Sequence, residues 1–275
     1  MMTVSADAVI LTGKVDVPVK DGTTMPAYVA RPAEQRDGPG ILVLQDQFGV
    51  TGFLRDTADR FARLGFTAIA PALYHRTGVF EMSYEDGYDA NKPHHKAVTW
   101  DGQIADAEAA FDWLLGDGIS SDRIGAMGFC MGGRLAYLAN AHRPLRAAIS
   151  FYGGRIAPDL LHHAKAQHGP LLFFWGGRDD VIPQEQVRAV ADGLTAAGAD
   201  HDQVTGRGRL PGGDGDAARD VRSGGAQQVG LGDCHWSAPH GNEIESAAAA
   251  TTNWDETPTV NGWPCQMPYS RLEGV

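Results

Sequence analysis

The sequence predicts an α/β fold with a mostly parallel central sheet that is covered by helices on both faces. Short apolar runs alternate with amphipathic stretches along most of the chain, and the runs have the length of strands. This alternation is typical of β-α-β units, whose right-handed crossovers place helices on the two faces of one sheet. Ligands bind at the carboxyl ends of the strands in such sheets, so chemistry is expected there.

The individual elements follow one another in a regular order. The first apolar run follows Asp-Gly-Pro-Gly, and an amphipathic stretch separates it from the run Thr-Ala-Ile-Ala-Pro. Later stretches repeat the pattern, with apolar residues at helical spacing between runs rich in Val, Ile, Leu and Phe. We expect strands at residues 41–44, 67–71, 123–129, 147–152 and 171–175, and helices at residues 56–64, 103–115, 134–141 and 184–197.

The domain organisation is predicted to be one α/β core at residues 1–204, followed by an atypical C-terminal segment at residues 205–275. A chain of 275 residues that is 43% hydrophobic can bury one large core. Residues 205–232 are rich in Gly, Arg, Asp and Ala and lack apolar periodicity. Residues 245–254 could form a short helix, but Pro258, Pro264 and Pro268 prevent a longer one. We expect the segment to complete the same domain or to be partly disordered.

Composition excludes several classes of partner. The net charge of −11 argues against binding to nucleic acid or to an anionic membrane surface, because both need basic surface. The N-terminus lacks a leader pattern, and no apolar run is long enough to span a membrane. Cys130, Cys234 and Cys265 form neither a disulfide framework nor a metal-binding spacing. The sequence therefore predicts a cytoplasmic protein, a monomer or small homo-oligomer, that binds a small molecule without a metal or cofactor.

Cys130 is the predicted nucleophile, because it lies in Gly-Phe-Cys-Met-Gly-Gly between a predicted strand and a predicted helix. Glycines two residues before and after the cysteine allow a tight turn that projects the thiol into a site. We expect the helix N-terminus to favour the thiolate. The N–H groups of Met131 and Gln47 would form the oxyanion hole. The alternative is that Cys130 is only a small buried residue.

At these residues the chain resembles the dienelactone hydrolase family, the cysteine hydrolases of the α/β-hydrolase fold. The resemblance covers roughly residues 20–200 and rests on several motifs besides the cysteine turn. They are Leu-Gln-Asp-Gln-Phe-Gly-Val at residues 44–50, Leu-Tyr-His-Arg at 73–76, Phe-Tyr-Gly at 151–153 and Gly-Gly-Arg-Asp at 176–179. The combination is far more specific than the cysteine motif alone.

The resemblance implies a Cys-His-Asp triad with Asp179 as the acid that orients the histidine, and Asp180 is the alternative. Asp46 stands where the family has a glutamate that holds or takes the thiol proton, and it is one methylene shorter. Arg76 matches an arginine that binds the substrate carboxylate, although an exposed loop arginine is equally compatible. Tyr152 is a predicted pocket-lining residue.

The triad histidine is absent from the position that the family pattern gives it. The family has a His in a Pro-Gly-Ala-x-His-Gly loop, but Gly215 occupies that position here. Further along, Ser-Ala-Pro-His-Gly places His240 before an Ala-rich stretch, so His240 is the predicted base. The alternatives are His235 and the loss of the base.

The predicted function is hydrolysis of a small ester or lactone, including carboxylated ones, through an acyl-cysteine. Two alternatives remain. One is a general esterase or thioesterase, and the other is a degenerate hydrolase fold that binds a ligand without the triad histidine.

Overall fold

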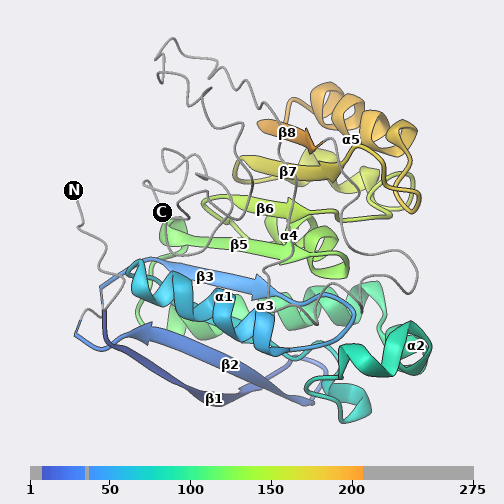
Figure 1. Ribbon diagram of the computed structural model, residues 1–275. Coiled ribbons are helices and arrows are strands. Elements are labelled where there is room, and N and C mark those ends of the chain that lie inside the picture. Colours follow the sequence, from blue (N-terminus) through green and yellow to red (C-terminus); the bar gives the residue numbers. More distant parts are fainter. Residues whose placement is uncertain (1–7, 35–36, 207–275) are drawn as a thin grey trace, which may run out of the picture.

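The computed structural model of the chain describes residues 8–34 and 37–206, and its centre is an eight-stranded sheet (Figure 1). The strands lie in the order β1-β2-β4-β3-β5-β6-β7-β8. Their bounds are β1 Ile10–Pro18, β2 Thr24–Pro32, β3 Gly40–Leu44, β4 Thr67–Pro71, β5 Ile124–Phe129, β6 Ala148–Phe151, β7 Leu171–Gly176 and β8 His201–Gly206. β2 pairs antiparallel with β1 and β4, and the remaining neighbours pair in parallel.

Helices cover both faces of this sheet. Their bounds are α1 Gly52–Arg63, α2 Gly87–Ala97, α3 Trp100–Gly116, α4 Met131–His142 and α5 Gln184–Ala197, with short 3-10 turns η1 His75–Thr77, η2 Tyr84–Asp86, η3 Ser121–Arg123 and η4 Leu161–Ala166. α3 packs against α4, α4 against η4, and η4 against α5, while α1 lies on the opposite face (Figure 1). The predicted α/β fold is therefore confirmed.

Most of the predicted elements are present, with shifted ends. The helix predicted at 184–197 has those bounds as α5, and the strand predicted at 67–71 is β4. α1 begins at Gly52, four positions before the predicted start at 56, because the turn at Thr51 already directs the chain into a helix. β8 extends to Gly206, which pairs with Gly176, so the sheet continues past the predicted core boundary at 204.

The elements that were not predicted lie where apolar patterning is weak. β1 is exposed along most of its length, and its partner β2 alternates buried and exposed side chains only in part. α2 has few apolar residues and contains Pro93. These segments carry little of the core, so their sequences lack the continuous apolar runs of the central strands.

The core lies on the two faces of the central strands. Every residue of β3, β4, β5, β6 and β7 is buried, as expected of parallel strands that are covered on both sides. Large side chains such as Trp175, Phe173, Tyr137 and Phe111 fill the space between the sheet and its helices. The loops that follow β3, β4, β5, β6 and β7 consequently meet at one edge, where Asp46, Arg76, Cys130, Tyr152 and Asp179 lie. Within the described residues, no helix is long and apolar enough to cross a membrane.

Candidate active site

Cys130 occupies a sharp turn between β5 and α4, and its backbone has a φ of 54°, which is unusual for a residue other than glycine. The turn is possible because its neighbours lack side chains. A Cβ on Gly132 would lie 2.3 Å from the carbonyl oxygen of Leu44, and one on Gly128 would lie 2.2 Å from that of Gly132. The N–H of Cys130 donates to the carbonyl of Phe151 at 3.0 Å, which fixes the turn against β6. The glycine motif thus has the steric reason that the sequence suggested.

The thiol of Cys130 is held in its neutral form. Burial raises its pKa to about 11, and the negative charge of Asp46 adds to the increase. Arg134 and the N–H of Met131 act in the opposite direction but do not compensate. The N–H of Met131 at the helix N-terminus lowers the pKa of Cys130 as expected, but desolvation and a nearby carboxylate outweigh this effect in the resting protein.

Asp46 follows β3 and faces the same site. Its Oδ1 accepts a hydrogen bond from the N–H of Phe48 at 2.8 Å, which tightens the turn after the strand. Burial nevertheless raises the pKa of Asp46 to about 6, because this single hydrogen bond does not replace the lost water. A carboxyl group with this pKa can accept a proton near neutral pH and return it.

Gln45 positions the Asp46 turn, a role that the sequence did not reveal. Its fully buried amide accepts a hydrogen bond from the N–H of Leu73 at 2.9 Å and donates one to the carbonyl of Asp46 at 3.2 Å. The loop after β3 is thereby tied to the loop after β4. Gln47 comes next in this turn, and Leu44 pairs with Gly128 across the two strands, so the predicted oxyanion donors belong to adjacent loops.

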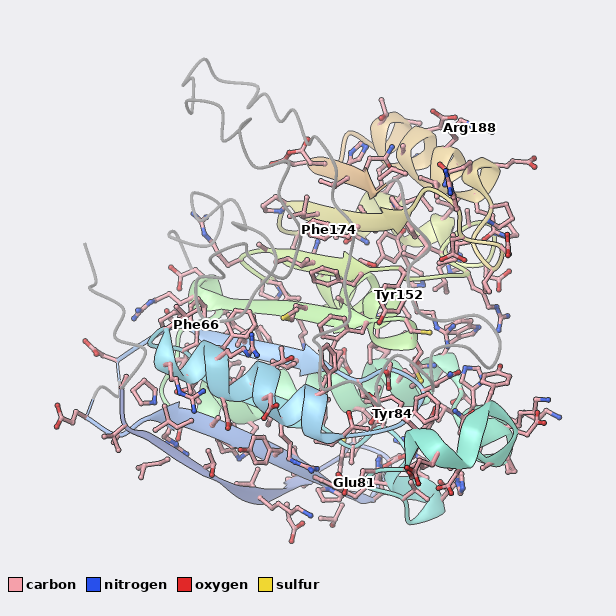
Figure 2. All side chains as sticks on the ribbon, in the orientation of Figure 1. Phe66, Glu81, Tyr84, Tyr152, Phe174 and Arg188 are labelled. Carbon is pink, nitrogen blue, oxygen red and sulfur yellow. The ribbon has the colours of Figure 1, made fainter. Side chains whose placement is uncertain are left out.

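Tyr152 lies close to the other polar groups of the site. Its side chain is only 7% exposed, and its pKa is raised well above the ordinary value, first by burial and then by Asp46, Cys130, Tyr84 and Asp179. Tyr152 and Tyr84 lie at the same edge of the sheet (Figure 2). Tyr152 has a φ of 41°, and its N–H donates to the carbonyl of Phe174 at 2.8 Å. The phenol of Tyr152 therefore lines the same site as the thiol.

Asp179 follows β7 in a turn that leaves part of its carboxylate available. Its Oδ1 accepts hydrogen bonds from the N–H groups of Val181 at 2.8 Å and Ile182 at 3.1 Å. Among the described residues, none donates a hydrogen bond to Oδ2. Its negative charge contributes to the raised pKa of Cys130 and of Tyr152, so it belongs to this site.

Arg76, the predicted ligand of a substrate carboxylate, is paired with carboxylates of the protein in this structure. Its Nη1 and Nη2 donate to the fully buried carboxylate of Asp106 at 2.8 and 2.9 Å, and its Nε donates to Asp21 at 2.8 Å. All three nitrogens are therefore occupied by carboxylates of the protein itself. The structure places Arg76 in a network that joins α3 to the turn between β1 and β2, and it does not offer a free cation to a substrate.

Arg134 is a functional candidate that the sequence analysis missed. It lies one helical turn after Cys130, is 7% exposed, and its positive charge lowers the pKa of Cys130. The available signal was an arginine within the otherwise apolar run Met-Gly-Gly-Arg-Leu-Ala-Tyr-Leu. A charged side chain at this position of a helix that packs on the sheet is either buried at a cost in free energy or has a function.

The predicted base His240, its alternative His235 and the Gly215 loop lie outside the described residues. Within the described ranges, no hydrogen bond joins a histidine ring to Cys130 or Asp179. The same ranges contain no group of three or more His, Cys, Asp or Glu residues that could hold a metal ion.

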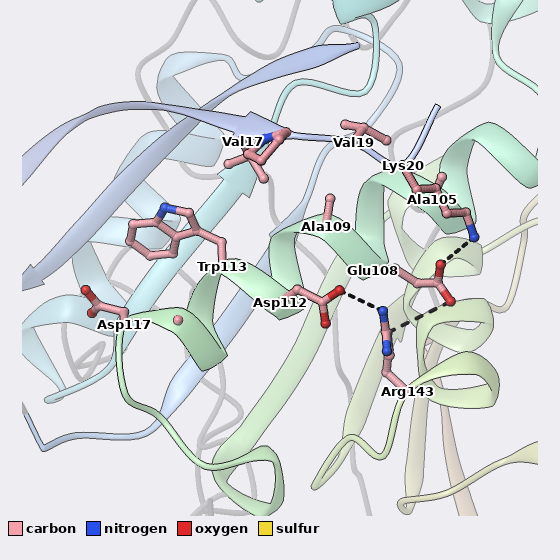
Figure 3. A pocket seen from close by; sticks show the side chains of 12 residues that line it. Val17, Val19, Lys20, Ala105, Glu108, Ala109, Asp112, Trp113, Asp117 and Arg143 are labelled. Carbon is pink, nitrogen blue, oxygen red and sulfur yellow. Dashed lines mark hydrogen bonds and ion pairs between the residues drawn. The ribbon is translucent and has the colours of Figure 1, made fainter. Parts of the chain in front are cut away.

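A separate surface groove of about 680 Å³ runs between the end of β1 and α3 (Figure 3). Most of its charged side chains pair with one another, with Lys20 bound to Glu108 at 2.7 Å and Arg143 to Asp112 at 2.8 Å. The groove contains none of the predicted site residues.

A cysteine on a left-handed turn between a strand and a helix, at the carboxyl edge of this sheet, defines a hydrolase of the α/β-hydrolase class. The comparisons with known proteins narrow the class. Residues 25–205 match the dienelactone hydrolase family, to which this chain belongs.

Individual relatives support the assignment. A protein of Escherichia coli strain K12, provisionally named carboxymethylenebutenolidase, is 36% identical over 210 residues, which cover 70% of this chain and 74% of the relative. The carboxymethylenebutenolidase of Pseudomonas putida is 29% identical over 192 residues, which cover 68% and 80%. A crystal structure of a provisionally named dienelactone hydrolase from Klebsiella pneumoniae has a TM-score of 0.65 at 29% identity and covers 78% of this chain and 96% of its own. The protein is a dienelactone hydrolase-like enzyme, which is a type of carboxylic ester hydrolase.

Proposed function

We propose that the protein hydrolyses a small ester or lactone through an acyl-enzyme on Cys130. The observation that carries this proposal is the turn at Cys130, where a thiol, two carboxylates and a buried phenol converge. A neutral thiol beside a carboxylate with a pKa near 6 can transfer its proton as the sulfur attacks a carbonyl. Asp46 is the acceptor in this scheme.

In the remaining steps of the reaction, each of the other predicted site residues has a role. The sulfur forms a bond to the carbonyl carbon, and the N–H groups of Met131 and Gln47 stabilise the oxyanion. Collapse of the tetrahedral intermediate expels the alcohol, which takes the proton from Asp46, and leaves an acyl-cysteine. His240, oriented by Asp179, then accepts a proton from water as the water oxygen attacks the acyl carbon. Collapse of this second intermediate breaks the carbon–sulfur bond, releases the acid and returns the proton from His240 to the sulfur. Tyr152 lines the pocket beside the acyl group.

The test is hydrolysis of a dienelactone, phenyl acetate and an acyl-coenzyme A thioester by the full-length protein. We expect turnover of the lactone or the ester, and a loss of more than roughly 1,000-fold in kcat/KM for Cys130→Ala. His240→Ala and Asp179→Asn should also lower kcat, since both act in deacylation. Unchanged turnover in Cys130→Ala would contradict the mechanism.

The same experiment distinguishes the alternatives. Preference for the thioester would indicate a thioesterase. A protein that forms a stable acyl-cysteine, or binds the lactone without turnover, would be a hydrolase fold that has lost its base, and His240→Ala would then change nothing.

A further inference from the structure

Arg134 is a buried cation without a counter-ion in the part of the chain that the structure describes. It is only 7% exposed, no carboxylate of the described residues lies within ion-pair distance of its guanidinium, and its buried Nε has no hydrogen-bond partner there. Nearby Arg155 differs, because it binds Asp159 at 2.8 Å. A dehydrated and unpaired charge is strongly unfavourable. Such a cost is expected where the charge acts on a group that becomes anionic only during a reaction.

The helix α4 directs the side chain of Arg134 toward the thiol of Cys130. The N–H of Arg134 donates to the carbonyl of Cys130 at 3.2 Å, so the two residues are one helical turn apart. Side chains at this spacing lie on the same face of a helix, and each Cα–Cβ bond tilts toward the helix N-terminus. The side chain of Arg134 therefore leans back toward the turn that carries the thiol.

The first turn of α4 is fixed closely against the sheet. A Cβ on Gly153 would lie 2.7 Å from the backbone nitrogen of Arg134, and one on Gly133 would lie 2.6 Å from the carbonyl oxygen of Phe151. The two glycines thus bring the loop after β6 into direct contact with this turn. The backbone of Arg134 is held in one place, as is required of a charge that acts without moving during the reaction.

Trp100 and His95 orient the guanidinium without neutralising it. The guanidinium lies over the ring of Trp100 at 4.8 Å, and its Nη2 lies 3.4 Å from Nε2 of His95. Burial, Arg134 and Arg155 lower the pKa of His95, so its ring is uncharged at neutral pH and accepts this hydrogen bond. An aromatic face and a neutral imidazole leave the positive charge of Arg134 intact.

The charge of Arg134 acts on the sulfur of the site. Among the groups that lower the pKa of Cys130, Arg134 comes first, ahead of the N–H of Met131. The Cys130 thiolate is likewise first among the groups that raise the pKa of Arg134, which burial lowers. The pKa of Asp46, by contrast, is set by burial and by the N–H of Phe48. A proton transfer from Cys130 to Asp46 therefore moves negative charge onto the group that Arg134 stabilises.

We propose that Arg134 is a positioning residue of the reaction, the counter-ion of the thiolate that forms when Cys130 gives its proton to Asp46. This inference rests on the proposed function and adds the cation that lowers the cost of this step. As the S–H bond breaks and the carboxyl O–H bond forms, the sulfur becomes the anion that Arg134 lacks at rest, and its electron pair then attacks the carbonyl carbon. The charge of Arg134 carries this role, so a neutral substrate depends on it as well.

The experiment measures the alkylation of Cys130 by iodoacetamide, a neutral reagent, in the full-length protein. Arg134→Met removes the charge and keeps a long side chain. Its rate should be roughly 10-fold lower than that of the wild type across the pH range in which the rate rises, because a smaller fraction of the thiol is ionised. Arg134→Lys should retain most of the wild-type rate, because it keeps the charge. The kcat/KM for phenyl acetate, a neutral ester, should follow the same order.

Arg143→Met is the matched control. Arg143 follows the opposite end of α4 and also lies over an aromatic ring, that of Phe111, at 5.7 Å, so the variant removes the same charge farther from the thiol. Its alkylation rate should equal that of the wild type. Mass mapping separates Cys130 from Cys234 and Cys265.

Stability distinguishes this role from a structural one. Arg134→Met should resist urea at least as well as the wild type, because it removes a buried charge that has no partner. A loosened site would instead expose Cys130 and accelerate its alkylation. An alkylation rate in Arg134→Met that equals or exceeds that of the wild type would overturn the proposal, and so would equally slow alkylation in Arg134→Lys.

Alkylation requires no turnover, so its failure and that of the proposed function are distinguishable. If Cys130→Ala retained turnover of phenyl acetate, the hydrolytic mechanism would be wrong. The order of the alkylation rates would still decide whether Arg134 stabilises the thiolate.

Discussion

At the scale of single residues, the thiol of Cys130 and the carboxyl group of Asp46 both lose their protons less readily than usual. Burial and Asp46 raise the pKa of Cys130 to about 11, and burial raises that of Asp46 to about 6. Asp46 stabilises the neutral form of Cys130, and burial stabilises the neutral form of both groups. The free protein is therefore protected from oxidants and electrophiles until a substrate reaches the site, since the thiolate is the reactive species.

Alkylation of Cys130 by iodoacetamide tests this coupling. The rate should keep rising with pH above pH 8, by about tenfold per unit, because the thiolate fraction grows up to a pKa near 11. Asp46→Asn should accelerate the reaction several-fold at pH 8, and the exposed Asp56→Asn should not. Mass mapping of the peptide that contains Cys130 separates it from Cys234 and Cys265. A rate that saturates between pH 6 and 7 would contradict the assignment.

Gly132 tests the steric requirement of the turn. Its substitution by alanine would place a Cβ 2.3 Å from the Leu44 carbonyl and 2.5 Å from that of Gln45. The helix or β3 has to move, so we expect a loss of about 1–3 kcal/mol in the free energy of unfolding and a large loss of activity. Gly116→Ala is the control, because no atom lies within 4 Å of its added Cβ. In urea unfolding, Gly132→Ala should lower the free energy of unfolding and Gly116→Ala should raise it, since alanine has a higher helix propensity than glycine at the end of α3.

At the scale of elements, Arg76 joins η1 to α3 and to the turn between β1 and β2, which adds side-chain contacts to the pairing of β2 with β4. Asp106 lies on α3 and is fully buried, Arg76 belongs to η1, and Asp21 lies in the turn between β1 and β2. Thr23 in the same turn contacts His75 at 2.9 Å. The network therefore fastens the antiparallel hairpin to the parallel core near the candidate site.

Asp106→Asn should destabilise the protein by about 1.5–4 kcal/mol in urea unfolding, because it removes one partner of a buried ion pair and leaves the Arg76 charge undercompensated. Asp117→Asn removes the partner of Arg31 at a more exposed site and should cost less than about 1 kcal/mol. Equal losses of unfolding free energy in Asp106→Asn and Asp117→Asn would show that the buried network stabilises the protein no more than the exposed ion pair does.

The elements that the sequence predicted are the buried ones, because burial requires apolar residues and so leaves a pattern in the sequence. The fully buried strands β3 to β7 read as apolar runs, and α5 was bounded correctly because Pro183 precedes it and Gly198 closes it in a left-handed conformation. The hairpin of β1 and β2 was missed because its exposed residues impose no pattern. The motif residues Cys130, Asp46, Tyr152 and Asp179 do meet at one edge, since the loops of parallel strands converge there.

Two features of the site could not be read from the sequence. Arg76 was assigned by motif position, but only the fold brings Asp106 and Asp21 to its three nitrogens. The pKa of Cys130 depends on dehydration and on a carboxylate from another strand, whereas the sequence shows only the helix that follows the cysteine. Both features depend on residues distant in the sequence, which a local pattern does not show.

At the scale of the whole molecule, Asp46 links stability to pH. Its pKa is raised from 3.8 to about 6 on folding, so the folded state binds its proton more tightly than the unfolded state does. The contribution of this proton to the free energy of unfolding is fully present below pH 4 and is lost as the pH rises through 6. Relative to Asp46→Asn, the wild type should therefore lose about 2–3 kcal/mol between pH 4 and pH 7.

Urea unfolding of both proteins at several pH values measures this difference. The exposed Asp56→Asn serves as the control and should parallel the wild type. A constant difference between wild type and Asp46→Asn across this range would contradict the raised pKa.

The three described residues other than glycine with a left-handed backbone are Cys130, Tyr152 and Arg155, and all belong to loops at the carboxyl edge of the sheet. A search for heat-tolerant variants would find glycine favourable at Arg155, because glycine relieves the strain. The same change would remove a cation from Trp100. Thermal tolerance and the cation–π contact with Trp100 are thus in competition at this position, and a protein engineer could improve one only by giving up the other.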